Sequence, residues 1–123
     1  MLLIRIAMTP VQIFTGARFD IVAYKGVYPI VEYEFEVLND DCSARDMDTS
    51  AGVFFKVLSK QGGKVLLNLE MTIATTSPNN FIYLSDDSEI VSLRAPRTLW
   101  YECYSLEGSP EYGELLFYGN LEL

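Results

Sequence analysis

The fold class of this chain is decided by the stretch PIVEYEFEVL, residues Pro29 to Leu38. Apolar and acidic side chains alternate along it, and the apolar set is Val31, Tyr33, Phe35 and Val37. Successive side chains of a β-strand point to opposite faces of a sheet. The stretch therefore predicts a strand with one face in a core and one acidic face, formed by glutamates, in water.

The same period of two recurs in four more segments. The positions that it predicts to face the core are Phe19, Ile21 and Ala23; Val53, Phe55 and Val57; Val65, Leu67, Leu69, Met71 and Ile73; and Leu115, Phe117, Leu121 and Leu123. Glycine, asparagine, aspartate and proline separate these segments, and these residues favour tight turns. The run Gln61-Gly62-Gly63-Lys64 predicts a hairpin. Many short strands joined by turns predict an all-β sandwich or barrel.

Other classes of structure have little support in the sequence. Residues Asp87 to Leu93 predict either one helical turn capped by Ser88 or a strand, since Ile90 and Val91 suit a strand equally well. Residues Met1 to Met8 predict a strand and not a signal peptide, because no basic region precedes them. No stretch approaches the roughly 20 apolar residues that span a bilayer. A length of 123 residues without repeat or linker predicts a single domain, residues 1–123.

The charge balance excludes some partners. The formal net charge is -8, and affinity for a phosphate backbone depends on Lys and Arg. We therefore expect neither nucleic acid nor an anionic membrane as a partner. The acidity suits solubility, or docking on a basic surface.

The residues that usually carry chemistry are scarce. The chain has no histidine, the commonest general base and a frequent zinc ligand, so we expect no enzyme and no cofactor. The acidic run Asn39 to Asp48 lacks the spacing of a calcium-binding EF-hand, which predicts a solvated loop and no metal site. Cys42 and Cys103 are expected to be reduced, because no secretion signal is found.

Aromatic residues are the remaining candidates for a binding site, because Tyr and Trp anchor many interfaces. The segment Leu99 to Leu106 has apolar residues on both parities, which predicts a strand buried on both sides. Gly119 is predicted to leave room for a bulge or for Trp100. The candidate protein-interface residues are Tyr24, Tyr28, Tyr112 and Tyr118.

Six stretches follow one another in a suggestive order: Glu34–Val37, Arg45–Ala51, Val53–Val57, Lys64–Leu69, Thr98–Tyr104 and Leu115–Leu121. This order of strands, acidic loop, glycine-containing hairpin and aromatic strand resembles a small immunoglobulin-like domain of tailed-bacteriophage virions, as in the N-terminal part of baseplate upper proteins. The resemblance implies an antiparallel immunoglobulin-like sandwich of seven to nine strands. It also implies a structural role on the phage particle, without catalytic residues.

The chain departs from the family pattern at its N-terminus, where residues 1–28 add two apolar strands or an arm. Residues Leu2 to Thr15 are either an arm that adds a strand to a neighbour or the first strand of the same sheet. No long extension follows to carry a fibre or receptor-binding head. We therefore expect a decoration, neck or tail-accessory protein sooner than a full baseplate protein.

The resulting hypothesis is a virion structural protein that is made in the host cytoplasm. It docks in multiple copies on other virion proteins of the capsid or tail. Two alternatives stay open: a carbohydrate-binding module, which needs coplanar exposed aromatic rings, and a phage-encoded inhibitor that binds a host protein.

Overall fold

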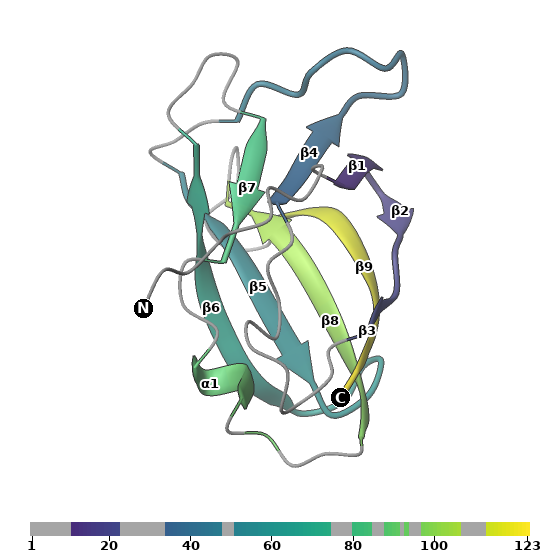
Figure 1. Ribbon diagram of the computed structural model, residues 1–123, viewed down its shortest axis with the longest axis vertical. Coiled ribbons are helices and arrows are strands. Elements are labelled where there is room, and N and C mark those ends of the chain that lie inside the picture. Colours follow the sequence, from purple (N-terminus) through teal and green to yellow (C-terminus); the bar gives the residue numbers. More distant parts are fainter. Residues whose placement is uncertain are drawn as a thin grey trace, which may run out of the picture.

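The computed structural model describes residues 11–22, 34–47, 51–74, 80–84, 88–91, 93, 97–106 and 113–123. These residues form nine strands and one helical turn (Figure 1). The elements are β1 (Val11–Phe14), β2 (Ala17–Arg18), β3 (Ile21–Val22), β4 (Glu34–Leu38), β5 (Val53–Leu58), β6 (Val65–Ile73), β7 (Phe81–Tyr83), α1 (Ser88–Val91), β8 (Thr98–Ser105) and β9 (Glu114–Glu122). The described part of the chain is therefore all-β, as predicted, and the segment that was open between helix and strand holds the helical turn α1.

The strands form one mixed sheet that nearly closes into a barrel. Its strand order is β1-β4-β7-β6-β5-β8-β9-β2, and β3 also pairs with β9. β6 pairs with β5 over most of its length and with β7 only at Thr72 and Ile73. The first and last strands of this order, β1 and β2, are consecutive in the chain and are joined by Thr15 and Gly16 alone. One continuous segment thus connects the two edges of the sheet.

The expectation of a wholly antiparallel sheet is wrong at this segment. The pairs β1–β4, β2–β9 and β3–β9 are parallel, and the other five strand pairs are antiparallel. We call residues 11–22, which contain β1, β2 and β3, the closing segment. Within it the Thr15 N–H donates to Leu38 C=O of β4 at 3.0 Å, and the Gly16 N–H donates to Leu116 C=O of β9 at 2.6 Å. The segment therefore passes from the edge of β4 to the edge of β9 between Thr15 and Gly16. Alternation does not reveal strand direction, because both kinds of sheet have a period of two.

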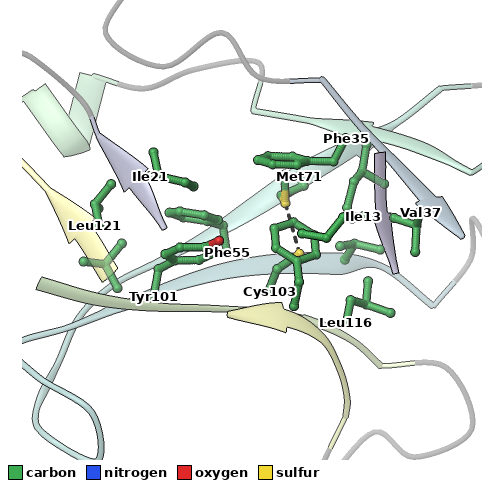
Figure 2. Packing of buried hydrophobic residues seen from close by; sticks show 14 of the residues in the cluster. Ile13, Ile21, Phe35, Val37, Phe55, Met71, Tyr101, Cys103, Leu116 and Leu121 are labelled. Atoms are coloured by element: carbon green, nitrogen blue, oxygen red, sulfur yellow. Dashed lines mark hydrogen bonds between the residues drawn. The ribbon is translucent and has the colours of Figure 1, made fainter. Parts of the chain in front are cut away.

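The core lies between the part of the sheet around β4 and the part around β8 (Figure 2). Phe35 of β4 packs on Phe117 of β9 with ring centroids 4.7 Å apart, and Phe55 stacks on Tyr101 at 4.9 Å. The predicted inward residues that the structure buries are Ile21, Phe35, Val37, Val53, Phe55, Val57, Met71, Phe117, Leu121 and Leu123. Alternation therefore predicted most of the core of the described residues.

Two β-bulges reverse the predicted direction of Val65 and Leu115. The register shifts so that Leu58 pairs with Val65 on β6 and Tyr104 pairs with Leu115 on β9, which leaves Leu66 and Leu116 as the extra residues. Leu116 is fully buried, whereas Val65 and Leu115 are 47% and 42% exposed. Each bulge lies in a run of three consecutive apolar residues. Such a run fits either parity, so the sequence could not show which of its residues faces the core.

The closing segment lies close against β9 at Gly119. A Cβ atom at Gly119 would overlap the carbonyl oxygen of Phe19. That oxygen accepts a hydrogen bond from the hydroxyl of Tyr101, which is buried in the core. Burial raises the pKa of the Tyr101 hydroxyl, which therefore stays protonated as a donor. Gly119 thus makes room for the backbone of Phe19 and not, as expected, for a bulge or for Trp100.

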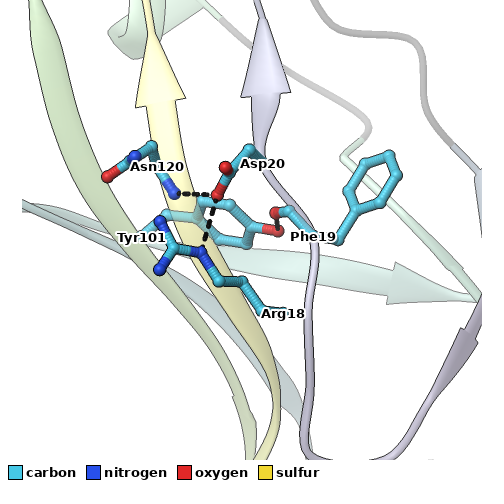
Figure 3. A network of polar contacts seen from close by, with 5 residues as sticks. All are labelled: Arg18, Phe19, Asp20, Tyr101 and Asn120. Carbon is cyan, nitrogen blue, oxygen red and sulfur yellow. Dashed lines mark hydrogen bonds and ion pairs between the residues drawn. The ribbon is translucent and has the colours of Figure 1, made fainter.

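Asp20 replaces a backbone acceptor beside this contact. Its carboxylate accepts the N–H of Asn120 on β9 at 2.9 Å and Nε of Arg18 at 3.2 Å (Figure 3). The hydrogen bond from Asn120, with a smaller contribution from Arg18, holds the pKa of Asp20 below its usual 3.8. The carboxylate of Asp20 thereby continues the hydrogen-bond ladder between the closing segment and β9, at the point where the Phe19 carbonyl group turns toward Tyr101.

Gly119→Ala is expected to destabilise the protein by about 1–3 kcal/mol, because the added methyl group has to displace the backbone of Phe19. Urea unfolding measures this loss. Asn120→Ala is the matched control: it lies on the same strand, keeps the backbone N–H that Asp20 accepts, and is expected to stay within about 0.5 kcal/mol of the wild type. Equal stabilities of the two variants would contradict the close approach.

Asp20 is expected to make stability fall in acid. A group whose pKa is lower in the folded state stabilises the fold above its unfolded pKa, and this contribution disappears as the pH drops through the folded pKa. The wild type should therefore lose more stability below pH 3.8 than Asp20→Asn, which keeps an acceptor but does not titrate. Thermal unfolding measured between neutral pH and strong acid checks this. Asp46→Asn, at an exposed side chain, controls for the removal of one carboxylate.

Candidate functional site

The outer face of β6, β5, β8 and β9 carries a regular array of side chains. They lie in three cross-strand rows: Val65, Leu58, Trp100 and Asn120; Asn68, Lys56, Glu102 and Tyr118; and Glu70, Phe54, Tyr104 and Leu115. We call these twelve residues the aromatic face. They lie on the outer side of the sheet because they alternate with the core residues of the same strands, although Leu58 and Trp100 are themselves covered. The two bulges add Val65 and Leu115 to the array.

One end of the aromatic face is built on Phe54 and Tyr104. Their rings stack with centroids 5.6 Å apart and planes 22° from parallel. The ammonium of Lys56 lies 5.2 Å from the ring centroid of Tyr104, which is a cation–π distance. Asn68 Nδ2 donates to the Tyr104 hydroxyl at 3.0 Å. Neighbours on two strands, β5 and β6, therefore hold the Tyr104 side chain in one orientation.

The other end of the aromatic face is built on Trp100 and Tyr118. Their ring centroids are 5.6 Å apart. The guanidinium of Arg18 lies 5.4 Å from the Trp100 ring centroid, and Trp100 Nε1 donates to Glu102 at 3.2 Å. Arg18 belongs to β2 and is the partner of Tyr118 in the ladder. The closing segment thus extends the face by one strand and covers the indole, which is only 5% exposed.

An ion pair lies at the centre of the face. Lys56 Nζ is 3.6 Å from Glu102 Oε1, and both side chains are about one-third exposed at 30% and 29%. With Arg18 and Asp20 beside them, the face holds two cations and two anions close together, and Glu70 lies at its margin. The outer side of β4 differs, since Glu34 and Glu36 lie there and Glu36 accepts a hydrogen bond from Gln12. The aromatic face is therefore the less acidic of these two surfaces.

Of the four predicted interface residues, the structure describes Tyr118, which is on this face. Tyr24, Tyr28 and Tyr112 lie outside the described residues. Sequence reasoning missed Phe54 and Tyr104. The available signal was the pair Phe54-Phe55, because adjacent residues of a strand point to opposite faces and one of the two rings has to point outward. The expected burial of Leu99–Leu106 on both sides holds at Trp100 but not at Glu102 and Tyr104, which are partly exposed.

The acidic loop forms the wall of a shallow cavity. The cavity has a volume of about 420 Å³ and is lined by Thr15, Asn39, Asp40, Asp41 and Arg45. Two of its three charged groups have partners: Arg45 forms a two-bond ion pair with Glu114, and the Asp41 carboxylate accepts the Ser43 N–H at 3.0 Å. Hydrogen bonds from Ser43 lower the pKa of Asp41. These contacts are those of a well-formed loop.

The described residues provide neither a metal site nor a membrane-spanning helix. Within the described ranges, no three His, Cys, Asp or Glu side chains come together as a group that could hold a metal ion. Nor does the described part of the chain contain a helix of the length and apolar character needed to cross a membrane.

The two thiols have opposite environments. Cys42 is exposed in the acidic loop, and Cys103 is fully buried with its Sγ 3.5 Å from Met71 Sδ (Figure 2). Burial raises the pKa of the Cys103 thiol. Because the thiolate is the reactive form, Cys103 is chemically inert in the folded protein.

Thiol labelling is therefore expected to modify a single cysteine in the native protein. Iodoacetamide at neutral pH should react with Cys42 alone, and Cys103 should react only after unfolding in denaturant. Peptide mass spectrometry locates the label, with Cys42→Ser as the control that should stay unlabelled until it unfolds. Rapid labelling of Cys103 in the folded chain would contradict its placement in the core.

Comparison with known proteins supplies no family for this arrangement of strands and side chains. No protein-family model matches the sequence, and a search of curated proteins finds no significant match.

Proposed function

We propose that the protein is a non-catalytic structural component that docks on other proteins through the aromatic face. The observation that carries this proposal is the pair of bulges, which turn Val65 and Leu115 out of the core and onto a face that already holds Phe54 and Tyr104. Bulges often re-aim side chains at functional positions. Aromatic residues and Arg are also the types most enriched in protein interfaces.

The assembly that we propose is a tailed-phage virion, with several copies of the chain on capsid or tail components. The order of strands and loops in the sequence supports this context by resemblance. As part of the same proposal, the parts of the sheet around β4 and around β8 are the two layers of an immunoglobulin-like sandwich. The packing of Phe35 on Phe117 supports two facing layers, because these residues come from different parts of the sheet.

A non-catalytic role has support from the chemistry of the titratable groups. Catalytic groups usually combine a shifted pKa with access to substrate. Tyr101 and Cys103 have raised pKa values, but both side chains lie in the core. Asp20 and Asp41 have lowered pKa values, which keep them ionised as acceptors for backbone N–H groups. In each case the shift accompanies a structural contact.

A protein partner suits the face better than a carbohydrate. Sugar rings stack on open aromatic faces. Phe54 and Tyr104 cover each other, and Arg18 lies over the ring of Trp100. A sugar would have to displace these contacts, whereas a protein can pack on the ring edges and on Val65 and Leu115.

An inventory of purified phage particles by mass spectrometry tests the proposal. We expect the chain in the particle, at hundreds of copies for capsid decoration or at about a dozen for a tail or neck position. Its presence in the lysate alone, with none in the particles, would contradict the structural role and favour an inhibitor of a host protein.

Incorporation of variants tests the surface. Leu115→Glu places a charge on the aromatic face and is expected to lower incorporation by at least about tenfold, since an unpaired charge buried in an interface costs several kcal/mol. Tyr83→Glu is the matched control, because Tyr83 is similarly exposed but lies on β7 beside Glu34. Equal incorporation of the two variants would show that another surface docks.

A further inference from the structure

We infer that the aromatic face binds a second copy of this chain, in a dimer whose two-fold axis runs along the strands between β5 and β8. The inference rests on the docking role proposed above and names the partner. It follows from the register of the face and from the distribution of charge over the molecule.

The register makes the face self-complementary. In a two-fold interface, every contact occurs twice: if residue i of the first copy contacts residue j of the second, residue j of the first also contacts residue i of the second. An axis that runs between β5 and β8 exchanges the positions of these two strands. The cross-strand partners are Lys56 with Glu102, Phe54 with Tyr104, and Leu58 with Trp100. The axis therefore places Lys56 of each copy against Glu102 of the other, and Phe54 against Tyr104. Leu58 and Trp100 are only 6% and 5% exposed, so they lie beneath this contact and add little to it.

Charge selects this axis over the alternative. A two-fold axis that crosses the strands through the middle row would place Lys56 near its own copy, and Glu102 likewise. Like charges so placed cost several kcal/mol in a desolvated interface. When the axis runs along the strands, the face residues of β6 in one copy meet those of β9 in the other. These contacts also avoid like charges, because Glu70 meets Leu115, Asn68 meets Tyr118 and Val65 meets Asn120.

The overall charge restricts where two copies can meet. Each copy carries a formal charge of -8, so contact is opposed wherever acidic side chains dominate. Contact through the outer side of β4 would bring together Glu34 and Glu36 of both copies. On the aromatic face, Arg18 and Lys56 lie close to Asp20 and Glu102. Of these two sheet surfaces, the aromatic face is the one on which a second copy meets balanced charge.

Sedimentation equilibrium on the full chain tests the inference. We expect a reversible dimer with a dissociation constant between about 1 μM and about 1 mM. Lys56→Glu and Glu102→Lys should each weaken it by at least about tenfold, because each variant brings two pairs of like charges together. Lys64→Glu makes the same charge change as Lys56→Glu in the turn between β5 and β6, and it should leave the dimer within about twofold of the wild type.

Mixing the two charge variants is the sharper experiment. Lys56→Glu and Glu102→Lys, each monomeric alone, should form a mixed dimer of about wild-type affinity, because opposite charges then meet at both contacts. The mixed dimer also shows that both variants are folded. The double variant, with both charges exchanged, should dimerise like the wild type.

Three results would overturn the inference: a wild type that stays monomeric up to about 1 mM, a dimer unaffected by either single variant, or single variants that do not pair when mixed. These results are distinguishable from failure of the proposed docking role. If the wild type is monomeric but Leu115→Glu still fails to enter particles, the face docks on a different protein.

Discussion

The closed sheet depends on one contact of the Phe19 carbonyl group. This group lies over Gly119 and accepts a hydrogen bond from the hydroxyl of Tyr101. Together with the β1–β4, β2–β9 and β3–β9 ladders, this contact holds the closing segment over the edges of β4 and β9, which would otherwise be unpaired. Unpaired edges of this kind recruit other strands and promote aggregation. The contact requires a residue without a side chain at position 119, an aromatic donor long enough to cross the core, and a carboxylate at position 20 that takes over the displaced hydrogen bond. Three distant parts of the sequence thus meet in one interaction.

The same contact controls the outer surface, because inward and outward residues alternate along β8 and β9. Tyr101 points inward and pairs with Gly119, so its neighbours Trp100 and Glu102 point outward beside Asn120 and Tyr118. A slip of one residue would exchange the two sets. The closing segment also carries Arg18, whose guanidinium lies over Trp100. The order of the aromatic face is therefore a consequence of how the core and the closing segment pack.

The sequence predicted the inward face where apolar and polar residues alternate strictly, as at Phe35 and Val37. It also did so where one polar residue fixes the parity, as Lys56 does for Val53, Phe55 and Val57. It failed at the runs that begin at Val65 and Leu115, where three consecutive apolar residues fit both parities and a bulge decides between them. It also missed the parallel pairing of the closing segment, because a period of two carries no information on direction. For the candidate site, it identified Tyr118 but not Phe54 or Tyr104. Their importance depends on which strands are neighbours, and strand order follows from contacts far apart in the sequence.

The bulges and the acidity of the chain are best understood together. Each bulge sacrifices ladder hydrogen bonds and leaves a large apolar side chain in water, which is unfavourable for an isolated molecule. A strongly acidic chain tolerates such a face, because net charge keeps it soluble. The acidic outer side of β4 also opposes contact through the wrong surface, and specificity commonly combines an attractive face with a repulsive one. In the proposed docking, Glu34 and Glu36 contribute to recognition without touching the partner: of the two sheet surfaces, they leave the aromatic face as the one with less repulsion.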